Sequence, residues 1–369
     1  MKRYHTKRIY VGNVPIGDSA PVSIQSMTNT PTSDVDATLK QICSLAKCGC
    51  EIVRCSIPDM KSAEAVSEII KESPIPVIGD IHFDWRLAIA AIRNGIHGIR
   101  LNPGNIGSAD RVKAVAEAAG EADIPIRVGA NAGSLPVGLY EKYLQAGLNH
   151  NNAIAESLCE AAQSQVSLLE QFGFKRIKVS LKASSVPIMV AAYRKFAAKS
   201  NYPLHLGVTE AGTPWRGIHK SAAGIGALLL DGIGDTIRVS LTAKPEEEVR
   251  SALALLESCE LRDSAPQIVA CPTCARTQYD LIETVSFIEK KIEEMKNAGK
   301  KIHLKKIAIM GCVVNGPGEA KDSDLGMAGG GDGKVVLFRY GKHFQTVSSD
   351  DAANIFLSII ESEYTDSMK

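Results

Sequence analysis

The stretch Ile-Lys-Val-Ser-Leu-Lys, residues 177–182, and the helical pattern over Ser185–Ala198 show the unit from which most of the chain is built. Apolar and polar residues alternate in the first part with period two, which is typical of a strand. The second part repeats apolar residues at helical spacing after a serine that is a suitable N-cap. The unit is therefore a β-strand followed by an α-helix.

The same unit recurs along the chain from Val22 to Glu257. We expect strands at Val22–Ser26, Ile52–Cys55, Val77–Asp80, Gly98–Leu101, Ile126–Val128, Ile177–Ser180, Leu204–Gly207 and Thr236–Val239. The expected helices are Ser33–Cys48, Asp59–Ser73, Asp84–Asn94, Ser108–Ala119, Ala153–Phe172, Ser185–Ala198, His219–Leu230 and Pro245–Ser258. This is the number of units in a (β/α)8 barrel of the TIM type, which is the fold we predict. A doubly wound open sheet is the alternative, because periodicity does not show whether a sheet closes.

The domain organisation follows from where the repeating unit stops. The barrel is predicted over residues 1–258, and the polar stretch 259–265 is predicted as a linker. Residues 266–369 are predicted as a smaller α+β domain. Its expected elements are strands Gln267–Ala270 and Lys305–Met310, a helix Gln278–Asn297, a Gly-rich turn region Gly326–Gly333, a hairpin (Lys334–Tyr340 and His343–Ser348) and a final helix from Asp350.

Composition excludes several classes of protein. Lys and Arg number 42 against 41 Asp and Glu, whereas nucleic acids and anionic membranes attract proteins with a basic surplus. No apolar stretch reaches the roughly 18 residues of a membrane span. The nine cysteines are odd in number and unevenly spaced, which argues against a secreted disulfide framework. We therefore expect a cytoplasmic protein that binds neither nucleic acid nor membrane.

Basic side chains stand at the ends of most expected barrel strands, and such ends converge on one mouth in this fold. Arg54, Arg100, Arg127, Arg238 and one of Lys178 or Lys182 would point into one cavity, where the nearest strand-end acids are Asp80 and Glu210. Each cation could pair with a neighbouring carboxylate, yet this count leaves an excess of about three positive charges. The pattern therefore predicts a diphosphate-sized anionic substrate. The other polar residues predicted to bind it are Asp80, His82, Asn102, Asn131, Ser180, His205 and Ser240.

Two cysteine motifs follow the first and second strands of the C-terminal domain. They are Cys271-Pro-Thr-Cys274 and Gly311-Cys-Val-Val-Asn-Gly-Pro-Gly-Glu319. Three thiolates suit an iron–sulfur cluster or zinc, with a fourth ligand from elsewhere. A redox dithiol at Cys271 and Cys274 is a further interpretation, although it needs no third cysteine. Spacing alone leaves these three interpretations open.

These motifs resemble the cluster-binding motifs of the 4-hydroxy-3-methylbut-2-enyl diphosphate synthase family, which acts late in the methylerythritol phosphate route to isoprenoids. The resemblance extends upstream through Arg100-Leu-Asn-Pro-Gly-Asn105, Ser180-Leu-Lys-Ala-Ser184 and His205-Leu-Gly-Val-Thr-Glu-Ala-Gly212, and covers nearly the whole chain. It implies a [4Fe-4S] cluster with the ligands Cys271, Cys274, Cys312 and Glu319. The resemblance also strengthens the prediction of a barrel.

The resemblance further implies an activity and partners. The reaction is the reductive ring opening and dehydroxylation of 2-C-methyl-D-erythritol 2,4-cyclodiphosphate, with electrons delivered through the cluster from flavodoxin or ferredoxin. Glu210 is the candidate proton donor, Glu319 the exchangeable carboxylate ligand, and Asn315 a substrate or near-cluster contact. A head-to-tail homodimer is implied, in which each cluster caps the partner's barrel.

The sequence leaves two other classes of function open. A zinc-dependent barrel lyase or aldolase could act on a sugar phosphate, with Lys182 as a Schiff-base residue. An iron–sulfur regulatory or RNA-binding protein is the non-enzymatic alternative, and the near-neutral charge argues against it.

Overall fold

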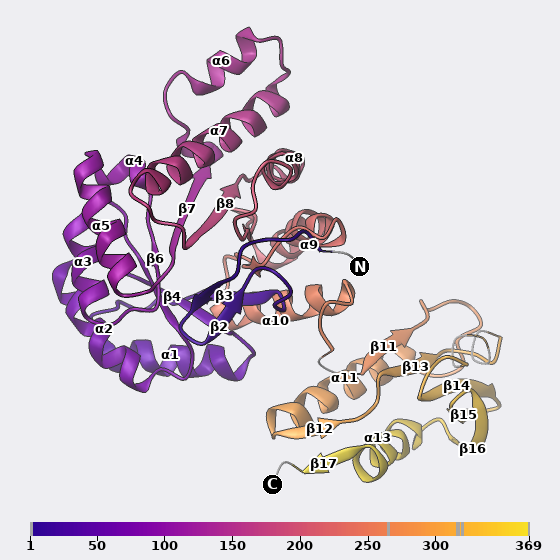
Figure 1. Ribbon diagram of the computed structural model, residues 1–369. Helices are drawn as coiled ribbons and strands as arrows, with labels where there is room; N and C mark the ends of the chain where they lie inside the picture. The colour runs from indigo at the N-terminus through magenta and orange to yellow at the C-terminus, as the bar shows by residue number, and fades with distance from the viewer. Residues whose placement is uncertain (1–2, 264–265, 315–317, 319–320, 368–369) are drawn as a thin grey trace. The chain divides into compact units, whose positions relative to one another are not determined.

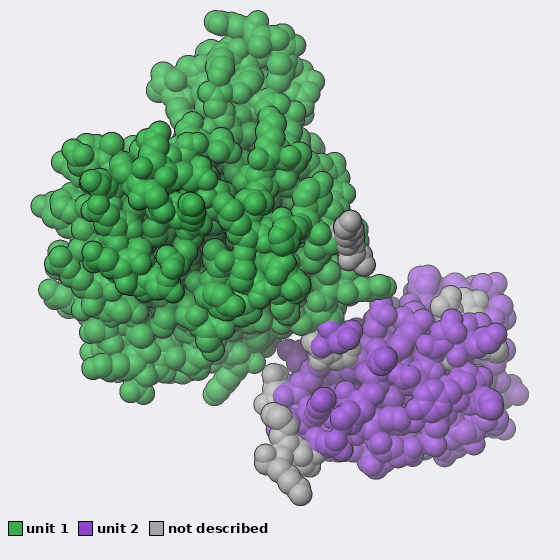
Figure 2. All heavy atoms as spheres, viewed as in Figure 1, with its two compact units in different colours: residues 1–262 green, residues 263–369 purple. Residues whose placement is uncertain are grey.

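The computed structural model describes residues 3–263, 266–314, 318 and 321–367 (Figure 1). The chain forms two compact units, Met1–Arg262 and Asp263–Lys369 (Figure 2). The division lies within the polar stretch 259–265. In the part of the chain that the structure describes, no helix has both the length and the apolar character needed to cross a bilayer.

Unit 1 is built around an eight-stranded parallel sheet with the order β8-β7-β6-β5-β4-β3-β10-β9. The strands are β3 (Ser23–Met27), β4 (Ile52–Ser56), β5 (Val77–Asp80), β6 (Ile99–Arg100), β7 (Ile126–Asn131), β8 (Ile177–Lys182), β9 (His205–Leu206) and β10 (Thr236–Ile237). A parallel bridge between Val179 and Leu204 joins the two ends of the sheet, where the Val179 N–H also donates to the Pro203 carbonyl at 2.9 Å. The predicted (β/α)8 barrel is thus confirmed, and the open sheet is excluded.

All of the helices predicted between the barrel strands are present. They are α1 (Val35–Lys47), α2 (Met60–Glu72), α3 (Trp85–Arg93), α5 (Ala109–Glu121), α7 (His150–Gln171), α8 (Val186–Ala197), α9 (Pro214–Leu230) and α10 (Pro245–Ser258). Asp34 and Asp59 cap α1 and α2 by accepting hydrogen bonds from Ala37 N and Ser62 N. Helix α9 begins five residues earlier than the predicted His219, because Pro214 is well suited to its first position.

Several short elements of unit 1 were not expected. They are the strands β1 (Ile9–Val11) and β2 (Val14–Ile16), the helices α4 (Pro103–Ile106) and α6 (Leu139–Gln145), and a 3-10 turn at Ala132–Ser134. Ile9, Val11 and Ile16 of the β1–β2 hairpin pack against Ile52 and Ile78, near the amino ends of β4 and β5. The hairpin therefore covers the barrel end opposite the carboxyl ends of the strands. Figure 1 shows α6 apart from the barrel, beside the first turns of α7.

Unit 2 has a five-stranded mixed sheet with the order β11-β13-β14-β15-β16. Its strands are β11 (Gln267–Ala270), β13 (Lys306–Met310), β14 (Leu325–Gly331), β15 (Lys334–Arg339) and β16 (Lys342–Ser348). The helices α11 (Leu281–Asn297) and α13 (Ala352–Glu363) contact each other, and a small sheet pairs β12 (Lys300–Ile302) with β17 (Thr365–Ser367). Ile288, Ile307 and Phe356, each fully buried, join both helices and the sheet in one core. This α+β arrangement agrees with the predicted fold class.

The prediction of a turn over Gly326–Gly333 is wrong, because most of this stretch lies in β14. The glycines are explained by close approach of neighbouring atoms. A Cβ on Gly329 would lie 2.4 Å from the Gly311 carbonyl oxygen, and a Cβ on Gly330 would lie 2.8 Å from Val336. A larger residue at Gly329 would therefore displace the turn that carries Cys312.

Candidate active site

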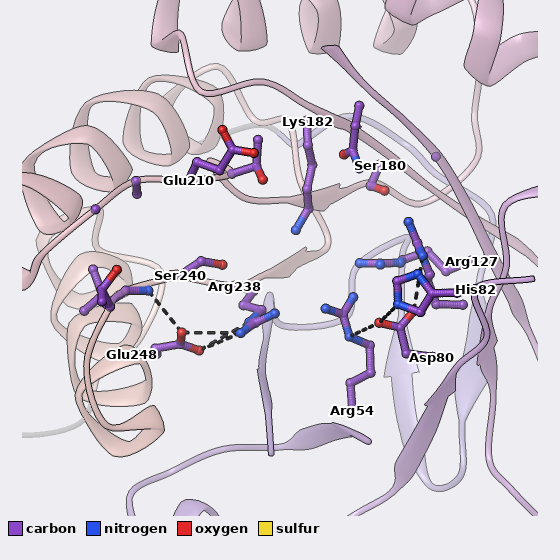
Figure 3. A pocket seen from close by; sticks show the side chains of 18 residues that line it. Arg54, Asp80, His82, Arg127, Ser180, Lys182, Glu210, Arg238, Ser240 and Glu248 are labelled. Atoms are coloured by element: carbon purple, nitrogen blue, oxygen red, sulfur yellow. Dashed lines mark hydrogen bonds and ion pairs between the residues drawn. The ribbon is translucent and has the colours of Figure 1, made fainter. Parts of the chain in front are cut away.

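A pocket of about 350 Å³ lies at the carboxyl ends of the barrel strands (Figure 3). Its walls come from strands β4 to β8, from the loops that follow β5, β9 and β10, and from helix α10. In Figure 3 the side chains of Arg54, Arg127 and Lys182 point toward one shared space. The pocket brings together most of the side chains for which strand alternation predicts a role, namely Arg54, Asp80, His82, Arg100, Arg127, Asn131, Ser180, Lys182, Glu210, Arg238 and Ser240.

Other predicted residues lie outside the pocket lining. Asn102 caps helix α4, where its Oδ1 accepts a hydrogen bond from Gly104 N at 3.2 Å. His205 is fully buried in the barrel interior, and of the two alternative lysines Lys182 lines the pocket whereas Lys178 is buried. Asn315 and Glu319 lie outside the described residues.

Asp80 is the acidic centre of one side of the pocket. Its carboxylate lies 3.6 Å from Arg54 Nε, 3.3 Å from Arg100 Nη1 and 3.5 Å from His82 Nε2. Burial opposes ionisation of Asp80, but the charges of Arg54 and then Arg100 outweigh it and lower the pKa of Asp80 below its usual value. The carboxylate is therefore ionised at neutral pH and holds basic groups from neighbouring strand ends.

Glu248 is a pocket acid that the sequence analysis missed. It lies on helix α10, is only 5 % exposed, and accepts hydrogen bonds from Arg238 Nε at 3.2 Å and from the Leu241 N–H at 3.0 Å. The predicted excess of about three positive charges is wrong, because that count considered only the acids at strand ends and Glu248 lies on a helix. Five pocket cations now face three carboxylates, so the excess is about two positive charges.

The basic groups of the pocket lie close enough together to repel one another. Burial and then the Arg54 guanidinium lower the pKa of Arg127, whose Nη1 is buried without a hydrogen-bond partner among the described residues. Burial and then the charge of Arg127 also lower the pKa of Lys182 well below its usual value. An anion in the pocket would relieve this repulsion and supply acceptors for the unpaired donors.

Glu210 lines the pocket from the loop after β9 and is exposed. Its backbone has a φ of 52°, in the left-handed region that a residue with a side chain rarely adopts. Gly212, two residues later, has a φ of 100°. The tight loop thus brings the Glu210 carboxylate to the pocket wall, where it can exchange a proton with a bound molecule.

The three motif cysteines occur in unit 2 on two adjoining loops. β11 and β13 pair in parallel with Ala270 opposite Ile309, so Cys271 and Cys312 follow neighbouring strands at the same edge of the sheet. The Gly311 N–H donates to Cys271 Sγ at 3.1 Å, and the Gln278 N–H donates to the Gly311 carbonyl at 3.0 Å. These bonds tie the loop after β11 to the turn that carries Cys312.

The cysteine loops fit a group that binds thiolates. All three thiols are free, and an N–H already donates to Cys271 Sγ, as it would to a sulfur with negative charge. A hydrogen bond from the backbone of Arg276 lowers the pKa of Cys274, which is exposed. Among the described residues, which omit Glu319, no three His, Cys, Asp or Glu side chains are placed so that they could hold one metal ion.

Comparison with known proteins gives the family. Residues 6–253 match the family model described as the GcpE TIM-barrel domain, and residues 267–362 match the GcpE protein C-terminal domain. The chain belongs to the GcpE family. A GcpE relative from Geobacter sulfurreducens is 51% identical over 356 residues, which are 96% of this chain and 97% of the relative. Another from Clostridium perfringens is 48% identical over 361 residues, 98% and 99% of the two chains.

Both GcpE relatives are named 4-hydroxy-3-methylbut-2-en-1-yl diphosphate synthase (flavodoxin). The resemblance stated from the sequence motifs is therefore confirmed. Among solved structures, the dihydropteroate synthase of Yersinia pestis has a TM-score of 0.50 and 11% identity, over 69% of this chain and 97% of that one. At that identity the likeness shows only that the GcpE barrel shares the general fold of this enzyme.

Proposed function

We propose that this chain is a flavodoxin-dependent 4-hydroxy-3-methylbut-2-en-1-yl diphosphate synthase. It reduces 2-C-methyl-D-erythritol 2,4-cyclodiphosphate with ring opening and loss of a hydroxyl oxygen. The observation that carries the proposal is the combination, in one chain of the GcpE family, of a cation-lined barrel pocket and three free cysteines on adjoining loops. The name of the relatives supports flavodoxin as the electron donor.

The pocket's charge supports a cyclic diphosphate as substrate. Each phosphate of such a diester carries one negative charge, which matches the excess of about two positive charges in the pocket. Arg54, Arg127 and Lys182 converge on the same space and would bind the phosphate oxygens (Figure 3). Arg100 and Arg238, held by Asp80 and Glu248, complete the set of cations. The same charges stabilise the oxygen that leaves when the ring opens.

Polar side chains between the cations would orient the carbon skeleton of the substrate. Asn131, Ser180 and Ser240 line the pocket and offer uncharged donors and acceptors for hydroxyl groups. Glu210 would donate the proton that the reaction consumes, since it is the pocket carboxylate without an ion pair to a described basic group. We retain Asn315 as a contact of the substrate or of the region around the cluster.

Cys271, Cys274 and Cys312 would hold a [4Fe-4S] cluster together with Glu319. When bound, such a cluster supplies electrons singly at low potential. The three thiolates would fix the cluster to unit 2, and the Gly311 N–H, which donates to Cys271 Sγ, would stabilise the negative charge on that sulfur. A carboxylate is a harder ligand than a thiolate and exchanges more readily, so Glu319 suits a position that the substrate must reach.

We further propose a cytoplasmic head-to-tail homodimer. The pocket belongs to unit 1 and the cysteines belong to unit 2, so each unit of the chain carries one half of the required chemistry. A second copy of the chain would supply the complementary half. No nucleic acid or membrane takes part in this reaction.

Anaerobic purification tests the cofactor. We expect a brown protein with absorbance near about 410 nm and about four iron and four sulfide per chain. Cys274→Ser should lose most of the iron, whereas Cys43→Ser, which changes a cysteine of α1 away from the motifs, should keep it. A colourless protein that holds zinc would contradict the proposal.

The lowered pKa of Lys182 also suits an amine nucleophile, which is the one observation that favours a Schiff-base lyase. Borohydride reduction in the presence of sugar phosphates separates the two functions. We expect no covalent adduct on Lys182. A trapped adduct, with substrate turnover that needs no reductant, would favour the lyase.

A further inference from the structure

Lys178 is a basic residue of the barrel interior that does not line the pocket. It lies two residues before Ser180 on the inward face of β8, yet only 1 % of it is exposed and it does not line the pocket. Its Nζ has no hydrogen-bond partner among the described residues. A buried ammonium without a partner is strongly unfavourable, so this amine is poorly suited to a permanent charge.

Charged and titratable groups face Lys178 from four other elements. Arg127 on β7 is its partner in the strand register, Arg54 lies on β4, and His205 lies on β9. The fourth is Asp235, immediately before β10. Like charge therefore dominates the surroundings of the amine.

Asp235 cannot serve Lys178 as a dedicated counter-charge. Its carboxylate accepts hydrogen bonds from Leu204 N at 2.8 Å, from Arg3 Nη2 at 2.9 Å and from Thr6 Oγ1 at 3.0 Å. These donors already include one full positive charge. The cationic groups around Lys178 thus keep an uncompensated excess.

Burial, followed by the Arg127 guanidinium, lowers the pKa of Lys178 to about 7, while Asp235 opposes the change. Both nitrogens of His205 are likewise buried and have no hydrogen-bond partner in the described part of the chain. Burial and then Arg127 lower the pKa of this imidazole well below its usual value. His205 therefore stays neutral, whereas a pKa of about 7 lets Lys178 change its charge near neutral pH. An anion nearby favours the charged form of an amine.

We propose that Lys178 takes up a proton when an anion binds in the pocket above it, so that occupation of the pocket and protonation of this buried amine are linked. The inference rests on the proposed function, because it needs the diphosphate as the anion. The proton comes from the solvent and bonds to the lone pair of Nζ, and no bond of the ligand changes. The barrel interior therefore carries more positive charge when the pocket is occupied than when it is empty.

Calorimetry on the two-unit chain with its cluster bound tests this linkage directly. The cyclodiphosphate is titrated anaerobically without reductant, so that it binds without turnover, in buffers of different ionisation enthalpy. The charge of the cyclodiphosphate itself is constant between pH 6 and pH 8. We expect proton uptake of about half a proton at pH 7 that rises toward about one at pH 8 and is small at pH 6. Affinity should fall as pH rises above 7, by at most about tenfold per unit for this one group.

Variants show which residue takes up the proton. Lys178→Met should bind the ligand but lose most of the uptake at pH 7.5, and Lys178→Gln serves the same purpose if the methionine variant does not fold. Lys175→Met, an exposed lysine three residues earlier, should behave as the wild type. Equal uptake in the wild type and in a folded Lys178 variant would overturn the inference and leave the proposed function intact, as would binding without any uptake. Failure of the wild type to bind the cyclodiphosphate would overturn both.

Discussion

Two carboxylates, Asp80 and Glu248, hold four of the basic side chains of the barrel pocket in place. Asp80 contacts Arg54, Arg100 and His82, which come from three different positions around the barrel. Glu248 does the same for Arg238 from helix α10. Both acids are more than nine-tenths buried, so they are poorly screened by solvent and their removal leaves charges uncompensated.

Asp80→Asn is therefore expected to destabilise the barrel by about 3 kcal/mol at pH 7, because it leaves buried cations without their acid. The pKa of Asp80 is lower in the folded state, so its stabilisation is present at neutral pH and is lost as pH falls below about 4. The difference between wild type and variant should shrink over that acid range. Denaturation followed by tryptophan fluorescence measures it, since Trp85 and Trp215 are the only two tryptophans and both lie in unit 1.

Asp231→Asn provides the control for this prediction. Asp231 pairs with Arg194 on the surface, where 37% of its side chain is exposed, so its loss should cost less than about 1 kcal/mol. Equal effects of the two substitutions would contradict the role assigned to Asp80.

Strand alternation predicted which residues face the barrel interior, but not how deep they lie. Lys178 and Lys182 share one face of β8, and only the second reaches the pocket. His205 was expected in the pocket on the same basis and is buried below it. Glu248 was missed because helix periodicity marks an inward face and does not reveal which barrel strand that face meets.

At the level of elements, the turn after β13 and the strand β14 depend on each other. Gly329 passes so close to the Gly311 carbonyl that a Cβ would lie 2.4 Å from it. Gly311 in turn donates to Cys271 Sγ and accepts from the Gln278 N–H. The glycine-rich strand thus determines where the cysteine loops lie.

Gly329→Ala should therefore lose most of the bound iron, because the added methyl group displaces the turn that carries Cys312. Tryptophan fluorescence should report unchanged unfolding of unit 1. Gly120→Ala is the control, since a Cβ there meets nothing within 4 Å, and it should keep its iron. Analysis of iron and acid-labile sulfide measures the bound cluster. A Gly329→Ala protein with as much iron as the wild type would contradict the role assigned to β14.

Long periodic elements were predictable, and short or glycine-rich ones were not. The helices around the barrel repeat their apolar face over several turns, which makes them recognisable from sequence. β1 and β2 have three residues each, too few for alternation to be seen. The glycines of β14 resemble a turn by composition, and their real cause is a contact with a residue distant in the sequence.

At the level of the whole molecule, the pocket and the cysteines belong to different compact units. Closure of the barrel depends on the contact of Val179 with Leu204, which local periodicity cannot show. The count of βα units favoured closure, and the resemblance to a known family strengthened that prediction. Assembly of the two units into one site stays a prediction of the proposed homodimer.

Co-expression of Cys271→Ser and Glu210→Gln chains with different affinity tags tests that assembly. Doubly tagged dimers contain one site with an intact pocket and intact cysteines if the sites are shared between chains, so we expect about half of the wild-type activity. Pairs of Cys271→Ser with Cys274→Ser should remain inactive. Inactive Cys271→Ser and Glu210→Gln heterodimers would argue against shared sites.

The most direct test of the central claim is turnover of 2-C-methyl-D-erythritol 2,4-cyclodiphosphate by the anaerobically purified chain with reduced flavodoxin. We predict formation of 4-hydroxy-3-methylbut-2-enyl diphosphate that requires the reductant and is abolished in Cys312→Ser. An iron-loaded wild-type protein that binds the cyclodiphosphate but forms no product with reduced flavodoxin would contradict the account.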